Sequence, residues 1–205
     1  MSDLSIHTHI FEPGTSPSVP TLLLLHGTGG DESDLLPLGR RVAPGRPLLS
    51  PRGNVNEHGQ LRFFRRLAEG VFDLEDLALR VKALSAWLAA AKTRYEIGTL
   101  DALGFSNGAN TIAAALLTVA SPNPLIRKAV LLRAMQTIAP TPGINLSGTE
   151  ILIVSGTRDP IIPIENAKRL AAQLQAAGAT VRHEVLQTGH ELTQDDLRLA
   201  TAFLS

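Results

Sequence analysis

Hydrophobic positions alternate along the chain between two patterns. Short continuous apolar runs that end in glycine or a polar residue are typical of buried strands in a parallel sheet. Between them, apolar residues recur at helical spacing, most clearly at Leu77, Val81, Leu84 and Leu88. The runs, together with a polar–apolar alternation at the start, predict strands over residues 4–11, 20–27, 46–53, 99–105, 128–134, 149–156 and 180–187. The helical patterns predict helices over about residues 33–41, 73–95, 107–119, 164–178 and 193–205.

This regular alternation favours an α/β fold, in which a mostly parallel, twisted sheet carries helices on both faces. Asp73 and Thr193 are suited to cap the starts of two helices, and Gly178 is suited to end a third. Pro37 fits a helix only in its first turn. No linker rich in proline, glycine and serine divides the 205 residues, so we predict a single domain over residues 1–205.

Residues 52–72 interrupt the alternation. The segment is polar, contains glycine and carries the string RFFRR. A long irregular segment in a compact domain is often functional. We therefore expect this excursion, defined as residues 52–72, to form a wall of a binding pocket rather than a separate cap domain.

Composition and charge narrow the function. Lysine plus arginine and aspartate plus glutamate both number 19, so the formal net charge is zero and no overall charge attracts the chain to nucleic acid or an anionic membrane. The absence of cysteine excludes disulfides, thiolate metal sites and a cysteine nucleophile. The first residues lack the basic and then apolar order of a secretory signal, and no apolar run approaches the roughly 20 residues of a membrane span. These features predict a soluble, cytoplasmic protein without nucleic-acid or membrane partners.

Ser106 stands between Gly104 and Gly108, where a predicted strand passes into a predicted helix. The pattern Gly-x-Ser-x-Gly in this context is typical of a nucleophile elbow, a sharp turn that exposes the serine oxygen above the sheet edge. Glycines remove side chains that would collide in the crowded turn. The positive end of the helix that begins at Asn107 favours negative charge beside the serine. A purely structural strand-to-helix turn is the alternative.

A serine hydroxyl needs a neighbouring base, and the base needs an orienting carboxylate. In the elbow arrangement both lie downstream, in the order serine, acid and histidine, on loops that follow later strands. Asp159 lies just past a buried strand in GTRDPIIP, and His190 lies on the last such loop in TGHEL. An aspartate before proline is also a common turn former, and Glu191 is a second, less favoured acid. The other five histidines are at positions that favour structural, surface or loop roles: His7, His9, His26, His58 and His183.

Acyl transfer also requires backbone N–H groups for the developing oxyanion. One should come from Asn107, directly after the serine, and the other from a glycine-rich loop after an earlier strand. LLLLHGTGGD supplies that loop, with Thr28 as the expected donor and Gly29 as the alternative. The loop lacks the Gly-Lys-Ser/Thr ending of a P-loop and the spacing of a dinucleotide site, which argues against nucleotide binding.

These motifs resemble those of the α/β-hydrolase superfamily, and within it of the phospholipase/carboxylesterase family, the relatives of the acyl-protein thioesterases. The strings HGTGGDESDLLPL, PRGNVNEHGQLRFFRRLAEGVFDLEDL, GFSNGAN, GTRDPI and GHELT resemble the bacterial subgroup that includes the hydroquinone-linked carboxylesterases. The likeness extends from about residue 20 to residue 204. It implies a hydrolase without a cap domain, with a Ser106–His190–Asp159 triad, an oxyanion hole of Thr28 and Asn107, and no metal or organic cofactor. It also implies a homodimer, which is frequent among such enzymes.

The excursion and one later residue supply candidate substrate contacts. Phe63, Phe64 and Met135 are the hydrophobic candidates, although ordinary core packing is favoured for at least one phenylalanine. The excursion is also basic, which favours a polar or anionic substrate; its arginines are Arg52, Arg62, Arg65 and Arg66. Arg52, directly after a strand, is the best charged candidate for the site.

The other arginines and the loop around Met135 leave the specificity open. Arg65 and Arg66 are expected to form surface pairs with Glu69, Asp73 or Glu75. Relatives tend to carry proline before the methionine at position 135, where this chain has Ala134. That segment borders the substrate in relatives, so the resemblance does not fix the acyl or alcohol preference.

The resulting hypothesis is a serine carboxylesterase that hydrolyses small to medium carboxylic esters through an acyl-enzyme. A thioesterase or lysophospholipase with the same triad is the alternative within enzymes, because the triad attacks esters and thioesters alike. If the protein is not an enzyme, the alternative is a non-catalytic relative that binds a ligand.

Overall fold

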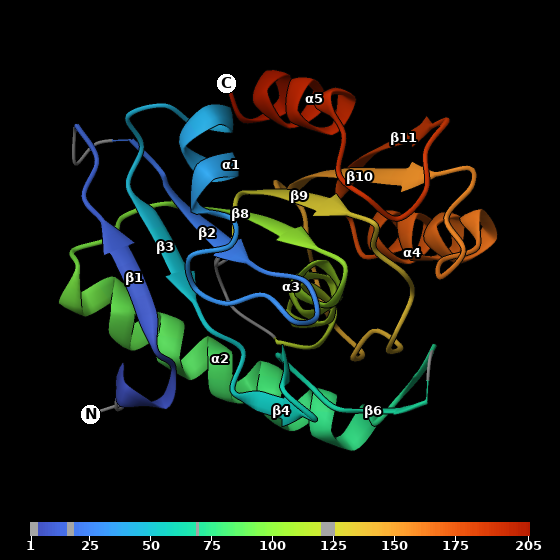
Figure 1. The fold of residues 1–205 in the computed structure, drawn as a ribbon, viewed down its shortest axis with the longest axis horizontal. Helices are drawn as coiled ribbons and strands as arrows, with labels where there is room; N and C mark the ends of the chain where they lie inside the picture. The colour runs from blue at the N-terminus through green and yellow to red at the C-terminus, as the bar shows by residue number, and fades with distance from the viewer. Residues whose placement is uncertain (1–3, 16–18, 69, 120–125) are drawn as a thin grey trace.

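The computed structural model describes residues 4–15, 19–68, 70–119 and 126–205. A seven-stranded sheet in the order β1-β3-β2-β8-β9-β10-β11 runs through it (Figure 1). Only the edge strand β1 is antiparallel to its neighbour, and the other adjacent strands are parallel. The strands of this sheet are β1 (His9–Glu12), β2 (Thr21–Leu25), β3 (Leu48–Pro51), β8 (Leu100–Phe105), β9 (Lys128–Leu132), β10 (Glu150–Gly156) and β11 (Thr180–Leu186).

Helices cover both faces of the sheet, as Figure 1 shows. On one face lie α1 (Leu36–Val42) and α5 (Gln194–Leu204), which also contact each other. On the other face lie α2 (Leu74–Arg94), α3 (Asn107–Thr118) and α4 (Ile164–Ala176). The predicted α/β architecture, a mostly parallel sheet between two helical layers, is therefore confirmed.

The alternation of side chains along each strand divides the apolar residues between two cores. In β2, Leu23 and Leu25 face the core beneath α2, α3 and α4, whereas Leu22 and Leu24 face the core beneath α1 and α5. All four are at most 1% exposed. Full burial of a leucine contributes about 1.5–3 kcal/mol to stability, so this central strand anchors both layers.

The ends of several elements differ from prediction. Residues 4–6 form a short 3₁₀ helix, η1 (Leu4–Ile6), instead of the start of the first strand. The Leu4 carbonyl accepts a hydrogen bond from the indole N–H of Trp87, which ties this turn to α2. β9 stops at Leu132, two residues before its predicted end, because Arg133 adopts a left-handed backbone with φ of 53°. α1 begins at Leu36, which puts Pro37 in its first turn as expected.

The excursion is regular, contrary to the prediction. It contains two antiparallel hairpins, one of β4 (Val55–Glu57) and β5 (Gln60–Arg62), the other of β6 (Arg66–Ala68) and β7 (Val71–Phe72). His58 and Gly59 form the first turn with φ of 52° and 88°, the positive values that a tight two-residue hairpin requires. The hairpins lie beside α2 in Figure 1, on the side of the molecule where the parallel strands end.

Candidate active site

Ser106 lies in a sharp turn between β8 and α3. Its backbone has φ of 50° and ψ of −111°, a conformation that costs a non-glycine residue about 1–3 kcal/mol. The turn is fixed on both sides, because the Ser106 N–H donates to the Leu132 carbonyl at 2.8 Å and its carbonyl accepts from the Asn110 N–H at 2.9 Å. The structure therefore holds the hydroxyl at the carboxyl edge of the sheet.

The two flanking glycines are required by close backbone packing. A Cβ at position 108 would lie 2.0 Å from the Leu25 carbonyl oxygen, and one at position 104 would lie 2.6 Å from the Ala109 nitrogen. Both contacts are to backbone atoms, which cannot rotate away. The Gly-x-Ser-x-Gly pattern thus follows from the packing of α3 against β2 and β8.

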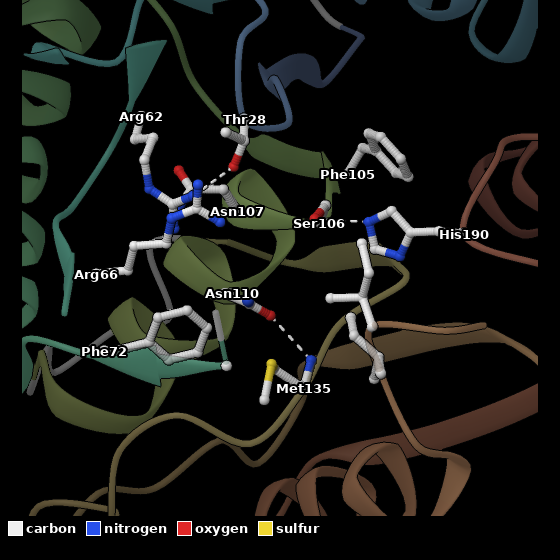
Figure 2. A pocket seen from close by; sticks show the side chains of 13 residues that line it. Thr28, Arg62, Arg66, Phe72, Phe105, Ser106, Asn107, Asn110, Met135 and His190 are labelled. Atoms are coloured by element: carbon white, nitrogen blue, oxygen red, sulfur yellow. Dashed lines mark hydrogen bonds between the residues drawn. The ribbon is translucent and has the colours of Figure 1, made fainter. Parts of the chain in front are cut away.

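Two hydrogen bonds connect Ser106, His190 and Asp159. The His190 Nε2 atom is 2.9 Å from the Ser106 hydroxyl, and its Nδ1 atom is 2.8 Å from Asp159 Oδ2. Figure 2 shows the first of these contacts at the edge of a cavity. The other Asp159 oxygen accepts from the N–H groups of Ile161 and Ile162 at 2.8 and 2.9 Å. The Asp159 side chain is 1% exposed, so the carboxylate is fixed in one orientation.

Glu191, the less favoured acid, is bound elsewhere. Its carboxylate accepts hydrogen bonds from the Thr188 hydroxyl at 2.6 Å and from the Gly189 N–H at 3.2 Å. The Thr188 bond is the main reason that the pKa of Glu191 falls to about 2, and backbone N–H groups lower it further. Within the described residues, the carboxylate that meets His190 is that of Asp159.

The loop that carries His190 is held by a residue that sequence reasoning missed. Arg133 donates from Nε to the Gly189 carbonyl at 3.0 Å and from Nη2 to the Glu191 carbonyl at 2.8 Å. These carbonyls belong to the two neighbours of His190. The sequence did contain a signal for this role, because Arg133 directly follows the apolar run KAVLL. A cation at the end of a buried strand needs fixed partners.

The loop after β2 carries both candidates for the first backbone donor, Thr28 and Gly29. The Gly29 N–H donates to the Leu61 carbonyl at 2.9 Å, which removes Gly29 as the alternative donor. For the N–H groups of Thr28 and Asn107, the described part of the chain offers no hydrogen-bond partner. Both residues line the same cavity as Ser106. Two backbone donors therefore remain available beside the serine.

His26 supports this loop from within the protein. One ring nitrogen, Nδ1, lies 2.7 Å from the Gly27 carbonyl, and the other accepts from the Gly53 N–H at 2.9 Å. Burial lowers the pKa of His26. The imidazole is thus a neutral link between the Thr28 loop and the start of the excursion.

Ser106 opens into a cavity of about 270 Å³. The excursion, the elbow and the loops after β2, β9, β10 and β11 all contribute to its wall (Figure 2). Its lining residues are Thr28, Arg62, Arg66, Gly70, Phe72, Phe105, Ser106, Asn107, Asn110, Met135, Ile161, Ile162 and His190.

Two asparagines of α3 hold opposite walls of the cavity. The Asn107 Oδ1 atom accepts from the Phe63 N–H at 2.8 Å, which ties the excursion to the elbow. The Asn110 Oδ1 atom accepts from the Met135 N–H at 2.9 Å, as Figure 2 shows. Met135, predicted to contact substrate, therefore lines the cavity.

The three other residues predicted to contact substrate do not line the cavity. Phe63 and Phe64 are 2% and 0% exposed and pack in the core beneath α2 and α3, because the Asn107 bond turns their segment inward. Arg52 forms an ion pair with Glu32, with Nη2 2.7 Å from Oε1, outside the cavity lining.

The excursion instead contributes Arg62, Arg66 and Phe72 to the cavity. Sequence reasoning missed Phe72, counted Arg62 among the basic residues of the excursion without singling it out, and favoured a surface pair for Arg66. Arg65 pairs with Asp73 at 2.8 Å as expected, whereas Arg66 pairs with Glu57 at 3.1 Å. The proposed partner Glu69 lies outside the described residues.

Comparison with known proteins places the chain among hydrolases. Residues 133–196 match a family model described as TAP-like protein, of the Abhydrolase_4 family. The chain is 41% identical over 194 residues to a Bacillus subtilis (strain 168) protein named "Putative hydrolase MhqD", with 94% of each chain covered.

Solved structures of carboxylesterases resemble this chain in both fold and sequence. The Bacillus cereus carboxylesterase is 41% identical with a TM-score of 0.89, and the match covers 97% of this chain and 93% of that one. A carboxylesterase from Mesorhizobium loti is 28% identical with a TM-score of 0.89, covering 100% of this chain and 96% of that one. No described helix is both long and apolar enough to cross a membrane.

Proposed function

Because the chain belongs to the phospholipase/carboxylesterase family of the α/β-hydrolase superfamily, we propose that it is a serine carboxylesterase acting on small to medium carboxylic esters. The observation that carries the proposal is the hydrogen-bond chain from Ser106 through His190 to Asp159, which opens into a cavity. A hydrolytic function follows from the family, and the serine mechanism is our inference from this geometry.

In the proposed acylation step, Ser106 Oγ attacks the ester carbonyl carbon while His190 Nε2 takes the hydroxyl proton. The carbonyl oxygen becomes an oxyanion beside the free N–H groups of Thr28 and Asn107, which stabilise it by hydrogen bonding. His190 then returns the proton to the alcohol oxygen as the C–O bond breaks. An acyl group remains on Ser106.

In the proposed deacylation step, water replaces the alcohol. His190 takes a proton from the water, whose oxygen attacks the acyl carbon, and the same two N–H groups receive the second oxyanion. The Ser106 oxygen then leaves with the proton from His190. Asp159 keeps the imidazole in the tautomer that accepts at Nε2 and stabilises its charged form.

The cavity favours substrates of modest size. Its volume of about 270 Å³ is at the small end of ligand pockets, and Phe72, Phe105, Met135, Ile161 and Ile162 give it an apolar part. A thioesterase or lysophospholipase remains the alternative, because the same attack cleaves thioesters. The length of the best acyl chain separates these activities.

The test is hydrolysis of 4-nitrophenyl esters of increasing acyl length by the wild type and Ser106→Ala in parallel. We expect activity that peaks at short or medium chains and falls by several orders of magnitude in the variant. Normal esterase activity in Ser106→Ala would refute the assignment. Failure of a fluorophosphonate to label wild-type Ser106 would favour the non-catalytic alternative.

Two further expectations stay predictions. The chain contains no cysteine, which fits a reducing compartment, and we propose a cytoplasmic location on that ground. Cell fractionation tests it. The homodimer expected from the resemblance is tested by light scattering at several concentrations.

A further inference from the structure

One wall of the cavity carries two guanidinium groups, those of Arg62 and Arg66. Figure 2 shows both on the far side of Ser106 from His190, next to Asn107 and Thr28. The described residues that line the cavity include no aspartate or glutamate. This wall is therefore positively charged, although the chain as a whole has no net charge.

Arg62 is buried without a close anionic partner. Its side chain is 4% exposed, and its nearest carboxylate contact joins Nε to Glu57 Oε2 at 3.6 Å. Neutral oxygens take its other contacts, since Nη1 donates to the Thr28 hydroxyl at 2.6 Å and Nε to the Phe64 carbonyl at 3.1 Å. A buried cation normally has a well-placed counter-ion, so this guanidinium is suited to receive an anion from the cavity.

The carboxylate of Glu57 forms ion pairs with both arginines. Arg66 Nε lies 3.1 Å from Glu57 Oε2, and Glu57 is the only ion-pair partner of either arginine among the described residues. Burial is the main cause that lowers the pKa of Arg62, and the nearby charge of Arg66 lowers it further. Two cations thus share one carboxylate that lies outside the lining, which leaves one positive charge uncompensated at the cavity.

Asn107 supplies an independent sign of a missing acceptor. The residue is 2% exposed, and its Oδ1 accepts from the Phe63 N–H, which fixes the direction of the amide. Its Nδ2 atom is buried and has no hydrogen-bond partner among the described residues. Asn107 lines the cavity beside the two guanidinium groups (Figure 2). A buried donor without an acceptor is costly, which shows that this wall holds more N–H donors than acceptors.

The proposed mechanism limits which part of a substrate can reach this wall. The alcohol must lie near His190, because it receives its proton from Nε2. The side of Ser106 opposite His190, where Figure 2 shows Arg62 and Arg66, is then available to the acyl part. We propose that the cavity selects esters whose acyl chain ends in a second carboxylate, the hemiesters of short dicarboxylic acids. This inference rests on the proposed esterase function.

A carboxylate suits these donors better than a neutral group does. Its two oxygens match the planar fork of a guanidinium, and charge-assisted bonds of this kind are stronger than neutral ones. The small cavity restricts the acyl chain to a few carbons.

The experiment compares 4-nitrophenyl hemiesters of succinic, glutaric and adipic acid with the same esters capped by a methyl group on the free carboxylate. Spontaneous hydrolysis is subtracted from each rate. At one chain length, kcat/KM should be higher for the hemiester by about tenfold or more, and added salt should reduce the difference. Equal or lower kcat/KM for the hemiester at every length would overturn the proposal.

Two neighbouring arginines give a matched pair of variants. Arg66→Gln should reduce the preference for the hemiester several-fold, because it removes one of the two cations. Arg65→Gln removes an exposed arginine that pairs with Asp73 outside the cavity lining, and should leave the preference unchanged. An identical preference in both variants would contradict the assignment. Arg62→Lys, checked for folding by circular dichroism, should also weaken the preference because it keeps the charge but loses the fork.

A binding measurement separates this proposal from the esterase function. Calorimetry on Ser106→Ala should show tighter binding of glutarate than of butanoate. Tighter glutarate binding without wild-type esterase activity would refute the function and keep the subsite. Esterase activity without a carboxylate preference would keep the esterase function and refute the carboxylate subsite. Tighter binding of propyl phosphate than of glutarate would overturn the dicarboxylate assignment.

Discussion

The guanidinium of Arg133 forms a two-point ion pair with Asp196 in the protein interior. Nη1 lies 2.7 Å from Oδ1 and Nη2 lies 2.9 Å from Oδ2, and the two side chains are 0% and 1% exposed. The same guanidinium holds the carbonyls of Gly189 and Glu191 on either side of His190. Asp196 also accepts from the Thr193 N–H at the start of α5. Arg133 therefore connects the end of β9, the His190 loop and α5.

We expect Arg133→Lys to impair both stability and turnover. Lysine keeps the charge but cannot reach the two carbonyls and both carboxylate oxygens together. Disrupting a buried pair costs about 3–5 kcal/mol when one partner is removed, so the free energy of unfolding should fall by up to about 3 kcal/mol. Turnover per active site, counted by fluorophosphonate titration, should fall by about tenfold or more because His190 is no longer fixed.

A second buried ion pair provides the control for Arg133. Arg46 Nη2 lies 2.6 Å from Asp101 Oδ2, near the start of β8 and far along the strand from Ser106. Arg46→Lys should lower the free energy of unfolding, measured in urea, without changing turnover per titrated site. Equal loss of turnover in both variants would show that Arg133 acts only through stability.

The packing of the elbow predicts a strong effect of one added methyl group. In Gly108→Ala, the new Cβ would lie 2.0 Å from the Leu25 carbonyl oxygen, so α3 must shift away from β2. Overpacking of this kind costs about 1–3 kcal/mol, and the shift also displaces the Asn107 N–H. Thermal unfolding and esterase rate measure the two effects. Gly98→Ala is the control, because a Cβ there meets nothing within 4 Å; comparable losses in both variants would contradict this account.

The strands of the parallel sheet and the loops of the proposed triad could be predicted because they depend on regular patterns. Continuous apolar runs mark the parallel strands, whose carboxyl ends share one edge of the sheet. Ser106, Asp159 and His190 each follow such a run, and the structure brings their side chains within hydrogen-bond distance. Local sequence therefore carried the information that their placement required.

The cavity wall could not be predicted in the same way. Whether Phe63 or Arg62 faces the cavity depends on the turn at His58 and on the bond from the Phe63 N–H to Asn107. The latter is a tertiary contact over 44 positions, which leaves no local pattern. Core packing, the alternative favoured for at least one phenylalanine, holds for both Phe63 and Phe64, because each gains more from burial in the core than from a place in the cavity wall.

The orientation of Asp159 predicts the behaviour of its amide variant. In Asp159→Asn, the amide oxygen can keep the bonds from the Ile161 and Ile162 N–H groups, which turns the NH₂ group towards His190. His190 Nδ1 must then accept, which leaves the proton on Nε2, where it cannot take the Ser106 proton. The rate should fall by about 10³–10⁴-fold with the fold intact, as circular dichroism can verify. Glu191→Gln should lose less than about tenfold. A similar loss in the two variants would exclude Asp159 as the orienting acid.

Burial of the neutral His26 ring predicts a loss of stability in weak acid. The residue is 1% exposed, and its Nε2 atom accepts from the Gly53 N–H, a bond that protonation would break. Burial therefore lowers the pKa of His26 below 6.5, and it also lowers the pKa of His7 and of His183. Below this pH the unfolded chain therefore binds more protons than the folded chain does. As the pH falls through the ordinary histidine value of 6.5, the free energy of unfolding should decrease.

Urea unfolding between about pH 8 and about pH 5 measures this decrease, in a range above the titration of ordinary carboxylates. His26→Gln should be less stable at about pH 8, because the buried ring is lost, but its stability should fall less steeply below about pH 6.5. His58→Asn is the control: His58 is exposed in the β4–β5 turn, where asparagine tolerates the positive φ. Its slope should equal that of the wild type. A wild-type slope in His26→Gln would mean that His26 is not the group whose protonation opposes folding, and would assign the effect to His7 and His183.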